Sequence, residues 1–290
     1  MCYKHLIRVL RPGTTWGVSE MPLGLHIFKT IHEAAKEGDL RRVEARLRKG
    51  ESVDAEDEKG ATALYYACRY GHWDTAALLL NEGADPDRGT KRGDTPLFQA
   101  AQEGHTSIVQ MLLSAGAKPT THNVKGSTPF LIAVYRGHAA IAGMLLERGV
   151  PMHEEDSHGR TALFVAIEKS HIEIVRELIK RGADVNHASH DGVTPLMIAI
   201  RAEDPAVVKL LIEKGAKVNV LTSSGLTPLL LAAAEGRYES AQLLLKHGAD
   251  LKQMYNHHML PWQLAQSKGH NKLALLLKEA LEGKVVKPKR

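Results

Sequence analysis

The chain has 290 residues, of which 43% are hydrophobic, 24% charged and only 5% aromatic, so it can bury a core built mainly from aliphatic side chains. Two cysteines and the absence of Asn-x-Ser/Thr argue against a disulfide-stapled secreted domain and favour an intracellular location, cytoplasmic or nuclear. No apolar run approaches the roughly 20 residues that span a bilayer, so no membrane contact is expected.

The basic charge is concentrated at the two ends of the chain. Of the net charge of +5, residues 1–26 contribute +2 and residues 284–290 contribute +4, so the body between them is close to neutral. Residues 1–26 are predicted to be a flexible basic leader, with a mitochondrial presequence as the alternative because no acid precedes Glu20. The tail 284–290 is predicted to be a solvated terminus, with a nuclear-import or acidic-surface contact as the alternative.

Residues 27–59 are predicted to form a terminal helix pair. The segment HEAAKEGDLRRVEARL alternates apolar and charged positions at helical spacing, and Gly38 and Gly50 stand where the two helices would end. This segment lacks the Thr-Pro start of the units that follow, and its charged face suits the solvent-exposed end of a stack.

Residues 60–257 repeat with a period of 33 residues. A Thr follows two positions after each repeating glycine, and Ala and Leu recur with the same period. The repeating glycines are Gly60, Gly93, Gly126, Gly159, Gly192 and Gly225. Strict register over six units indicates a solenoid of stacked supersecondary units.

The unit that starts at Gly93 shows how each repeat is predicted to fold. Thr95 is a candidate N-cap and Pro96 fits the first helical position, where a missing N–H has no cost. Gly104 ends this helix, and a second helix with a leucine-rich apolar side runs to Gly116. Two helices this short cannot bury their apolar faces alone, so each unit must stack on its neighbours.

These motifs resemble the ankyrin-repeat family over about residues 27–281, as in TPLFQAAQEGH, TPLLLAAAEGR and KRGADVNHASHDG. The resemblance implies an all-α solenoid of helix-turn-helix units with hairpin-like finger loops, made of an N-terminal cap (27–59), six full repeats (60–257) and a C-terminal cap (258–283). The chain departs from the family pattern after Pro-Leu, where an apolar residue replaces the usual His. The residues in that position, predicted to pack in the core, are Tyr65, Phe98, Leu131, Phe164, Met197 and Leu230. Cys68, in a small-residue position, is predicted to be buried.

The sequence offers no convincing catalytic or metal site. His153 and His158 are five residues apart in a predicted loop, whereas a zincin motif needs two histidines four apart on a helix. No phosphate-binding glycine loop and no Gly-x-Ser-x-Gly motif occurs. We therefore expect no enzyme activity, metal, cofactor or small-molecule substrate.

The resemblance implies protein binding through the concave face, at the finger tips and the ends of the first helices. Tyr70 and Tyr135 are expected there as exposed aromatics at corresponding positions two units apart. Cations of three consecutive central units, with acids interleaved, give a mild preference for an acidic peptide segment or domain as partner. The candidate partner-binding residues are Arg69, Tyr70, Lys91, Arg92, Asp94, Gln102, Lys125, Tyr135, Arg136, His158, Arg160 and Arg201. The alternatives are a regulatory adaptor or inhibitor subunit of a larger complex, and nucleic-acid association through the basic termini.

Asn186 is a candidate modification site. It ends the segment LIKRGADVN, which resembles the pattern at which ankyrin repeats are hydroxylated on Asn by an oxygen-dependent dioxygenase. The alternative is that Asn186 only closes a turn. Asn219 has a similar place but Lys217 replaces the preceding acid, so it fits the pattern less well.

Overall fold

The computed structural model describes residues 30–256 and 258–284 and contains sixteen helices there, arranged as eight pairs. The predicted leader 1–26 and all of the predicted tail except Lys284 lie outside these residues. The pairs are α1 (Ile31–Glu37) with α2 (Leu40–Arg48), α3 (Ala63–Tyr70) with α4 (Trp73–Asn81), α5 (Pro96–Glu103) with α6 (Thr106–Ser114), α7 (Pro129–Arg136) with α8 (Ala139–Glu147), α9 (Ala162–Glu168) with α10 (Ile172–Lys180), α11 (Pro195–Arg201) with α12 (Pro205–Glu213), α13 (Pro228–Glu235) with α14 (Tyr238–Lys246), and α15 (Pro261–Ser267) with α16 (Asn271–Leu281).

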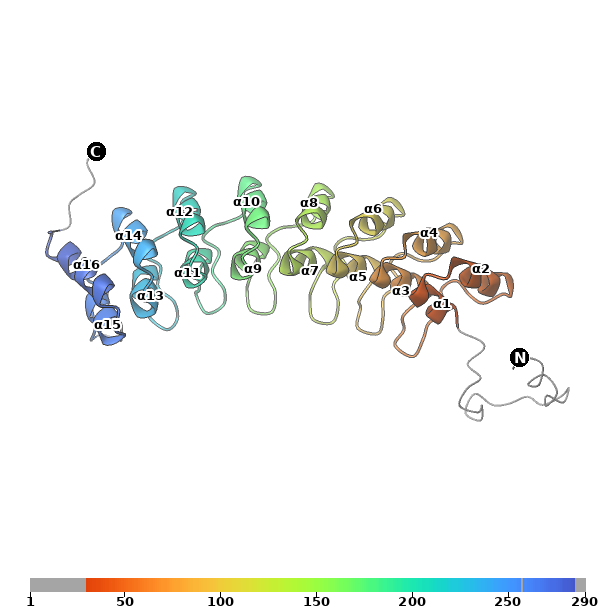
Figure 1. Cartoon of the computed structure of the whole chain (residues 1–290), viewed down its shortest axis with the longest axis horizontal. Helices are drawn as coiled ribbons and strands as arrows, with labels where there is room; N and C mark the ends of the chain where they lie inside the picture. Colours follow the sequence, from red (N-terminus) through yellow and green to blue (C-terminus); the bar gives the residue numbers. More distant parts are fainter. Residues whose placement is uncertain (1–29, 257, 285–290) are drawn as a thin grey trace, which may run out of the picture.

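The pairs stack into a bowed, elongated array (Figure 1). The odd-numbered helices form one row and the even-numbered helices a second, and each helix packs against its own pair partner and the adjacent helices of its row. The long loops between pairs project beyond the odd-numbered row, on the inner side of the arc (Figure 1). This architecture confirms the predicted all-helical solenoid.

Local capping explains where the helices begin and end. The Thr95 hydroxyl accepts a hydrogen bond from the Phe98 N–H at 3.1 Å, and Pro96 occupies the first turn of α5. Gly104 then ends α5 with φ of 82°, a left-handed conformation that glycine adopts at low cost. Asp204 caps α12 by accepting from the Val207 N–H at 3.0 Å, and Pro205 follows it in the first turn.

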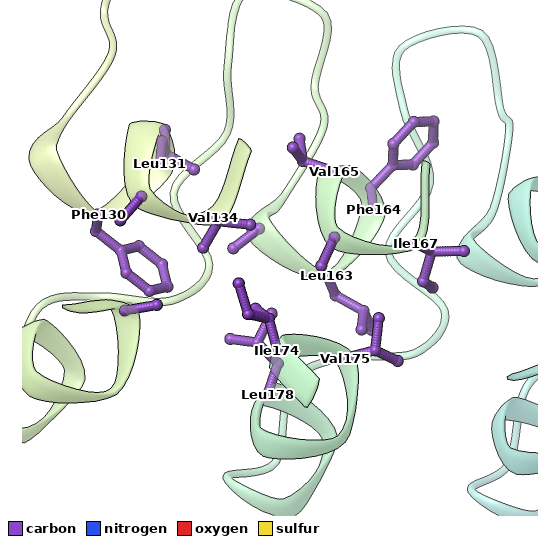
Figure 2. Close-up of a cluster of buried hydrophobic side chains, with 14 of the residues drawn as sticks. Phe130, Leu131, Val134, Leu163, Phe164, Val165, Ile167, Ile174, Val175 and Leu178 are labelled. Carbon is purple, nitrogen blue, oxygen red and sulfur yellow. The ribbon is translucent and has the colours of Figure 1, made fainter. Parts of the chain in front are cut away.

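Aliphatic side chains of successive pairs interlock in one continuous core. Figure 2 shows Phe130 and Val134 of α7 facing Leu163 of α9, with Leu178 of α10 beneath them. Cys68 is fully buried, as predicted, and its burial raises the pKa of the thiol. The position after Pro-Leu is buried in all six full units, which confirms its predicted apolar role.

In five of the helix pairs, a histidine contacts the backbone of the preceding pair. The His105 ring Nε2 lies 3.2 Å from the carbonyl oxygen of Arg69, and His138 lies 3.1 Å from that of Gln102. The same contact joins His72, His171 and His270 to carbonyls 36 residues earlier, at 2.9 to 3.2 Å. The accepting carbonyls lie at or near the ends of the odd-numbered helices, so these bonds fix the backbone beneath the inner face.

Within residues 30–256 and 258–284, no helix is long and apolar enough to cross a membrane. The same part of the chain contains no cluster of three or more His, Cys, Asp or Glu side chains placed to hold a metal ion.

Candidate partner-binding surface

The candidate residues fall on loops and helix ends of the inner side of the arc. Arg69 and Tyr70 end α3, Gln102 lies near the end of α5, Tyr135 and Arg136 end α7, and Arg201 ends α11. Lys91, Arg92 and Asp94 lie in the loop before α5, Lys125 in the loop before α7, and His158 and Arg160 in the loop before α9. Figure 1 shows these loops side by side along the arc.

The finger loops are held by hydrogen bonds within each loop and between neighbours. The Thr90 hydroxyl accepts from the N–H groups of Arg92 and Asp94, both at 3.3 Å. The Lys91 N–H donates to the Lys59 carbonyl at 2.9 Å, and the Val124 N–H donates to the Arg92 carbonyl at 2.8 Å. Adjacent fingers are therefore fixed relative to each other, which lowers the entropic cost of binding a partner on them.

The cations of this surface differ in whether an acid already compensates them. Arg160 donates to Asp156 at 2.7 Å and to Glu168 at 3.2 Å. Although partial burial opposes ionisation of Asp156, the hydrogen bonds that it accepts from Arg160 and from the His158 N–H hold its pKa below the ordinary value. The bond to Asp156 also raises the pKa of Arg160. Arg160, included among the candidate contacts on sequence grounds, thus has its charge compensated within its own unit.

The remaining candidate cations are mostly unpaired. Arg201 lies 3.6 Å from Glu235, a loose ion pair. Over the part of the chain that the structure describes, no ion pair involves Arg69, Lys91, Arg92, Lys125 or Arg136. All five side chains are exposed: Arg69 and Arg136 at the ends of α3 and α7, Lys91 and Arg92 in the loop before α5, and Lys125 in the next loop. Positive charge available to a partner therefore concentrates over the first half of the arc.

Tyr70 and Tyr135 are 49% and 46% exposed, as predicted. They do not occupy corresponding positions, however: Tyr135 aligns with Arg69 one 66-residue step earlier, whereas Tyr70 aligns with Arg136. The Lys169 ammonium lies 4.7 Å from the Tyr135 ring centroid, and Tyr70 stacks on Tyr66 with centroids 6.5 Å apart. The two exposed rings thus belong to different local environments.

Tyr66, which sequence reasoning did not single out, supports the exposed Tyr70. The Tyr66 hydroxyl donates to Asp57 Oδ2 at 2.6 Å, and the Lys36 ammonium lies 4.0 Å from the Tyr66 ring centroid. Burial together with the hydrogen bond to Asp57 raises the pKa of Tyr66, so the phenol remains a donor. These contacts fix the orientation of the aromatic surface at the end of α3.

A pocket of about 550 Å³ lies between the first fingers and helices α3 and α5. Five of the candidate residues line it, namely Arg69, Lys91, Arg92, Asp94 and Gln102. The other seven candidates do not line this pocket: Tyr70, Lys125, Tyr135, Arg136, His158, Arg160 and Arg201. Gln99, which was not a candidate, also lines it. The signal that could have found Gln99 is its position, because the equivalent residue in each other full unit is aliphatic or Tyr.

Asn186 bridges two successive units. Its Nδ2 donates to the Gly215 carbonyl at 3.0 Å, and its Oδ1 accepts from the Lys217 N–H at 2.8 Å. Asn219 makes the equivalent pair of bonds with Gly248 and Asp250. The amide of Asn186 therefore closes an inter-unit turn, and hydroxylation of Asn186 stays a prediction.

The geometry is that of a repeat solenoid with an exposed, preformed inner face, and the family comparison agrees. The family model described as ankyrin repeats (3 copies) matches residues 31–123, 116–189 and 184–255. The chain belongs to the ankyrin-repeat family. Ankyrin repeats are in general protein–protein interaction modules.

A solved structure and several curated proteins show similarity to the chain. The crystal structure of the human ASB11 ankyrin repeat domain is 32% identical, with a TM-score of 0.68 over 77% of this chain and 99% of that one. Probable E3 ubiquitin-protein ligase XBOS33 of Oryza sativa subsp. japonica is 44% identical over 50 residues, 17% of this chain and 10% of that protein. Human ankyrin repeat domain-containing protein 39 is 38% identical over 69 residues, 24% of this chain and 38% of that protein. The matches thus span only a tenth to two fifths of these curated relatives.

Proposed function

We propose that this chain is a non-enzymatic protein-binding module that captures a peptide segment or domain on the inner face of its solenoid. The observation that carries the proposal is the set of exposed tyrosines and unpaired cations on the ends of α3 and α7 and on the adjacent finger loops, which are hydrogen-bonded to one another. Tyr and Arg are the side chains that most often anchor interfaces, because each supplies contact area or paired hydrogen bonds at a small entropic cost. The intracellular location expected from the cysteine count is part of this proposal.

The unpaired positive charge supports an acidic partner. Lys91, Arg92, Lys125 and Arg136 present cations along the first half of the inner face, where no acid pairs with them among the described side chains. An Arg guanidinium grips a carboxylate with two hydrogen bonds, whereas a second cation on the partner would be repelled.

A regulatory adaptor or inhibitor subunit would use the same inner face, so it is a special case of this proposal rather than a rival. The probable ubiquitin ligase among the relatives matches over 50 residues of repeats only, so its activity does not transfer to this chain. Nucleic-acid association would depend on the basic ends, because the body between them is close to neutral and presents no extended basic face.

The test is affinity capture of partners by the full chain, with and without nuclease treatment. The double variant Tyr135→Ala/Arg136→Ala removes one anchor pair, and Arg92→Glu reverses an unpaired charge. Truncating an anchor costs about 2 kcal/mol or more, so we expect at least tenfold weaker binding for the double variant. Arg92→Glu should slow association and reduce its dependence on salt. Arg160 is left intact because its loss would break the Asp156 ion pair.

The matched control is the charge swap Lys209→Glu/Glu213→Lys on α12. These two exposed side chains lie 3.8 Å apart on the even-numbered row, so the swap keeps both the net charge and the pair. Binding that survives the inner-face variants and is lost with the swap would place the partner on the opposite face. Binding that disappears on nuclease treatment would favour the nucleic-acid alternative.

A further inference from the structure

The amide of Gln99 is a buried polar group whose oxygen has no partner. Gln99 is 4% exposed, and its Oε1 forms no hydrogen bond in the structure. Leaving a buried acceptor unsatisfied costs free energy, so folded proteins pair nearly all such groups. Each such exception needs an explanation, and functional sites are among the places where such local rules are broken.

The same position in the other units shows that packing does not require an amide there. The equivalent residues are Tyr66, Ile132, Val165, Ile198 and Leu231. Tyr66 satisfies its hydroxyl by donating to Asp57 in the preceding finger. In the Gln99 unit the finger residue equivalent to Asp57 is Thr90, whose hydroxyl accepts from the backbone of its own loop. Gln99 therefore lacks the finger partner that Tyr66 has.

Gln99 lies in the pocket of about 550 Å³ described above, and cations surround that pocket. Lys59, Arg69, Lys91 and Arg92 line it, and none of the four takes part in an ion pair within residues 30–256 and 258–284. Two acids also line the pocket, Glu58 and Asp94, and Asp94 accepts a hydrogen bond from Asn123 at 2.9 Å. The pocket therefore combines a net positive lining with a buried hydrogen-bond acceptor.

We infer that this pocket binds an acidic peptide segment, with a Glu or Asp carboxylate among the cations and an adjacent backbone N–H donated to Gln99 Oε1. The carboxylate supplies the charge that the four cations lack, and an extended peptide supplies N–H donors beside its side chains. A volume of this size accommodates a side chain together with the neighbouring peptide units. The inference rests on the proposed function and assigns it a specific pocket and ligand chemistry.

The test begins with selection of a random 12-residue peptide library, displayed on phage, against the immobilised full chain. We expect the enriched peptides to share an Asp or Glu at a fixed position. The enriched peptide is then synthesised with a fluorescent label, and its affinity is measured by fluorescence polarisation for the wild type and each variant. Enriched peptides without a shared acid, or a selection that enriches no peptide, would overturn the inference.

Gln99→Leu separates a binding role from a structural one. Leu occupies the equivalent position as Leu231, so the variant should fold, and its melting temperature should equal or exceed that of the wild type because an unsatisfied acceptor is removed. Peptide affinity should nevertheless fall at least tenfold. Gln110→Leu, an exposed position on α6, is the matched control and should leave affinity unchanged. Unchanged affinity in Gln99→Leu would contradict the inference.

Charge reversal completes the test and separates the two proposals. Arg92→Glu should lower the affinity for the acidic peptide at least tenfold and reduce the dependence of this affinity on salt. Peptide binding that resists Gln99→Leu and Arg92→Glu but is lost in Tyr135→Ala/Arg136→Ala would overturn the pocket while leaving the inner-face proposal intact. If peptide binding survives all three of these variants and is lost in the charge swap on α12, both the pocket and the inner-face proposal would be overturned.

Discussion

At the scale of single residues, a glycine in one unit is matched to a histidine in the next. Gly104 has φ of 82°, and a Cβ there would lie 2.6 Å from the His138 ring. Two units lack this glycine, and there the paired residues are Ser170 with Asp204 and Glu203 with Arg237. The Arg237 guanidinium donates to the Arg201 carbonyl at 3.3 Å, in place of the histidine contact. Side chains are thus tolerated at the left-handed position where no ring occupies the space.

This pairing predicts non-additive mutations. Gly104→Ser should destabilise the protein by more than the roughly 1–2 kcal/mol of a left-handed non-glycine residue, since its Cβ also meets the His138 ring. Gly104→Ser/His138→Asp reproduces the Ser170–Asp204 pair found naturally in the chain. We expect the double variant to be less destabilised than the sum of the two single variants by at least about 0.5 kcal/mol, measured by urea unfolding. Strictly additive losses would show that the ring contact does not matter.

At the scale of the elements, the turns between units are fastened by side chains of the preceding unit. Asp54 accepts from the Asp85 N–H at 3.1 Å, and Asp87 accepts from the Lys118 N–H at 2.8 Å. Asn186 makes the equivalent contact and adds a donated bond to Gly215. These bonds set the spacing of adjacent helix pairs at the base of the fingers.

Removing one of these inter-unit hydrogen-bonding side chains should lower the free energy of unfolding only modestly. Asn186→Ala loses two hydrogen bonds whose partners become accessible to water, so we expect a loss of about 1–2 kcal/mol in the free energy of unfolding. Asn81→Ala, an exposed position at the end of α4, should change it by less than about 0.5 kcal/mol. Urea denaturation followed by circular dichroism measures both. A cost at Asn186 no larger than at Asn81 would mean that the turn does not depend on the amide.

At the scale of the whole molecule, stability is shared between neighbouring pairs. Leu145 of α8 and Leu277 of α16 are both fully buried. Helix α8 packs against α6, α7 and α10, whereas the main neighbours of α16 among the described elements are α14 and α15. Burial alone therefore does not decide what each leucine contributes, because the number of units that depend on it differs.

The two leucines give a matched test of the solenoid. Leu145→Ala should cost about 2–5 kcal/mol and destabilise pairs on both sides. Leu277→Ala should cost less and loosen only the last pair. Urea unfolding gives the total loss, and hydrogen exchange measured by mass spectrometry locates it along the chain. Equal global losses from the two variants would contradict nearest-neighbour stacking.

The amino-acid sequence by itself determined the helix limits, the period and the buried positions. Capping residues such as Thr95 and Gly104 act within one or two turns of backbone, and the buried position after Pro-Leu repeats with the same 33-residue spacing, so local patterns were sufficient. The sequence also narrowed the candidate surface to the finger loops and helix ends. The predicted correspondence of Tyr70 with Tyr135 was wrong, because two repeat periods from Tyr70 lead to Arg136.

Only the tertiary structure decided which of those surface residues remain available to a partner. Arg92 and Arg160 each stand next to a repeating glycine in a finger loop. Asp156 and Glu168 nevertheless compensate the charge of Arg160 alone. Gln99 is unsatisfied because its finger offers Thr90 where the preceding unit offers Asp57. Ion pairs and buried hydrogen bonds depend on how far particular side chains reach between elements. A periodic pattern fixes the backbone that carries those side chains but does not fix their partners.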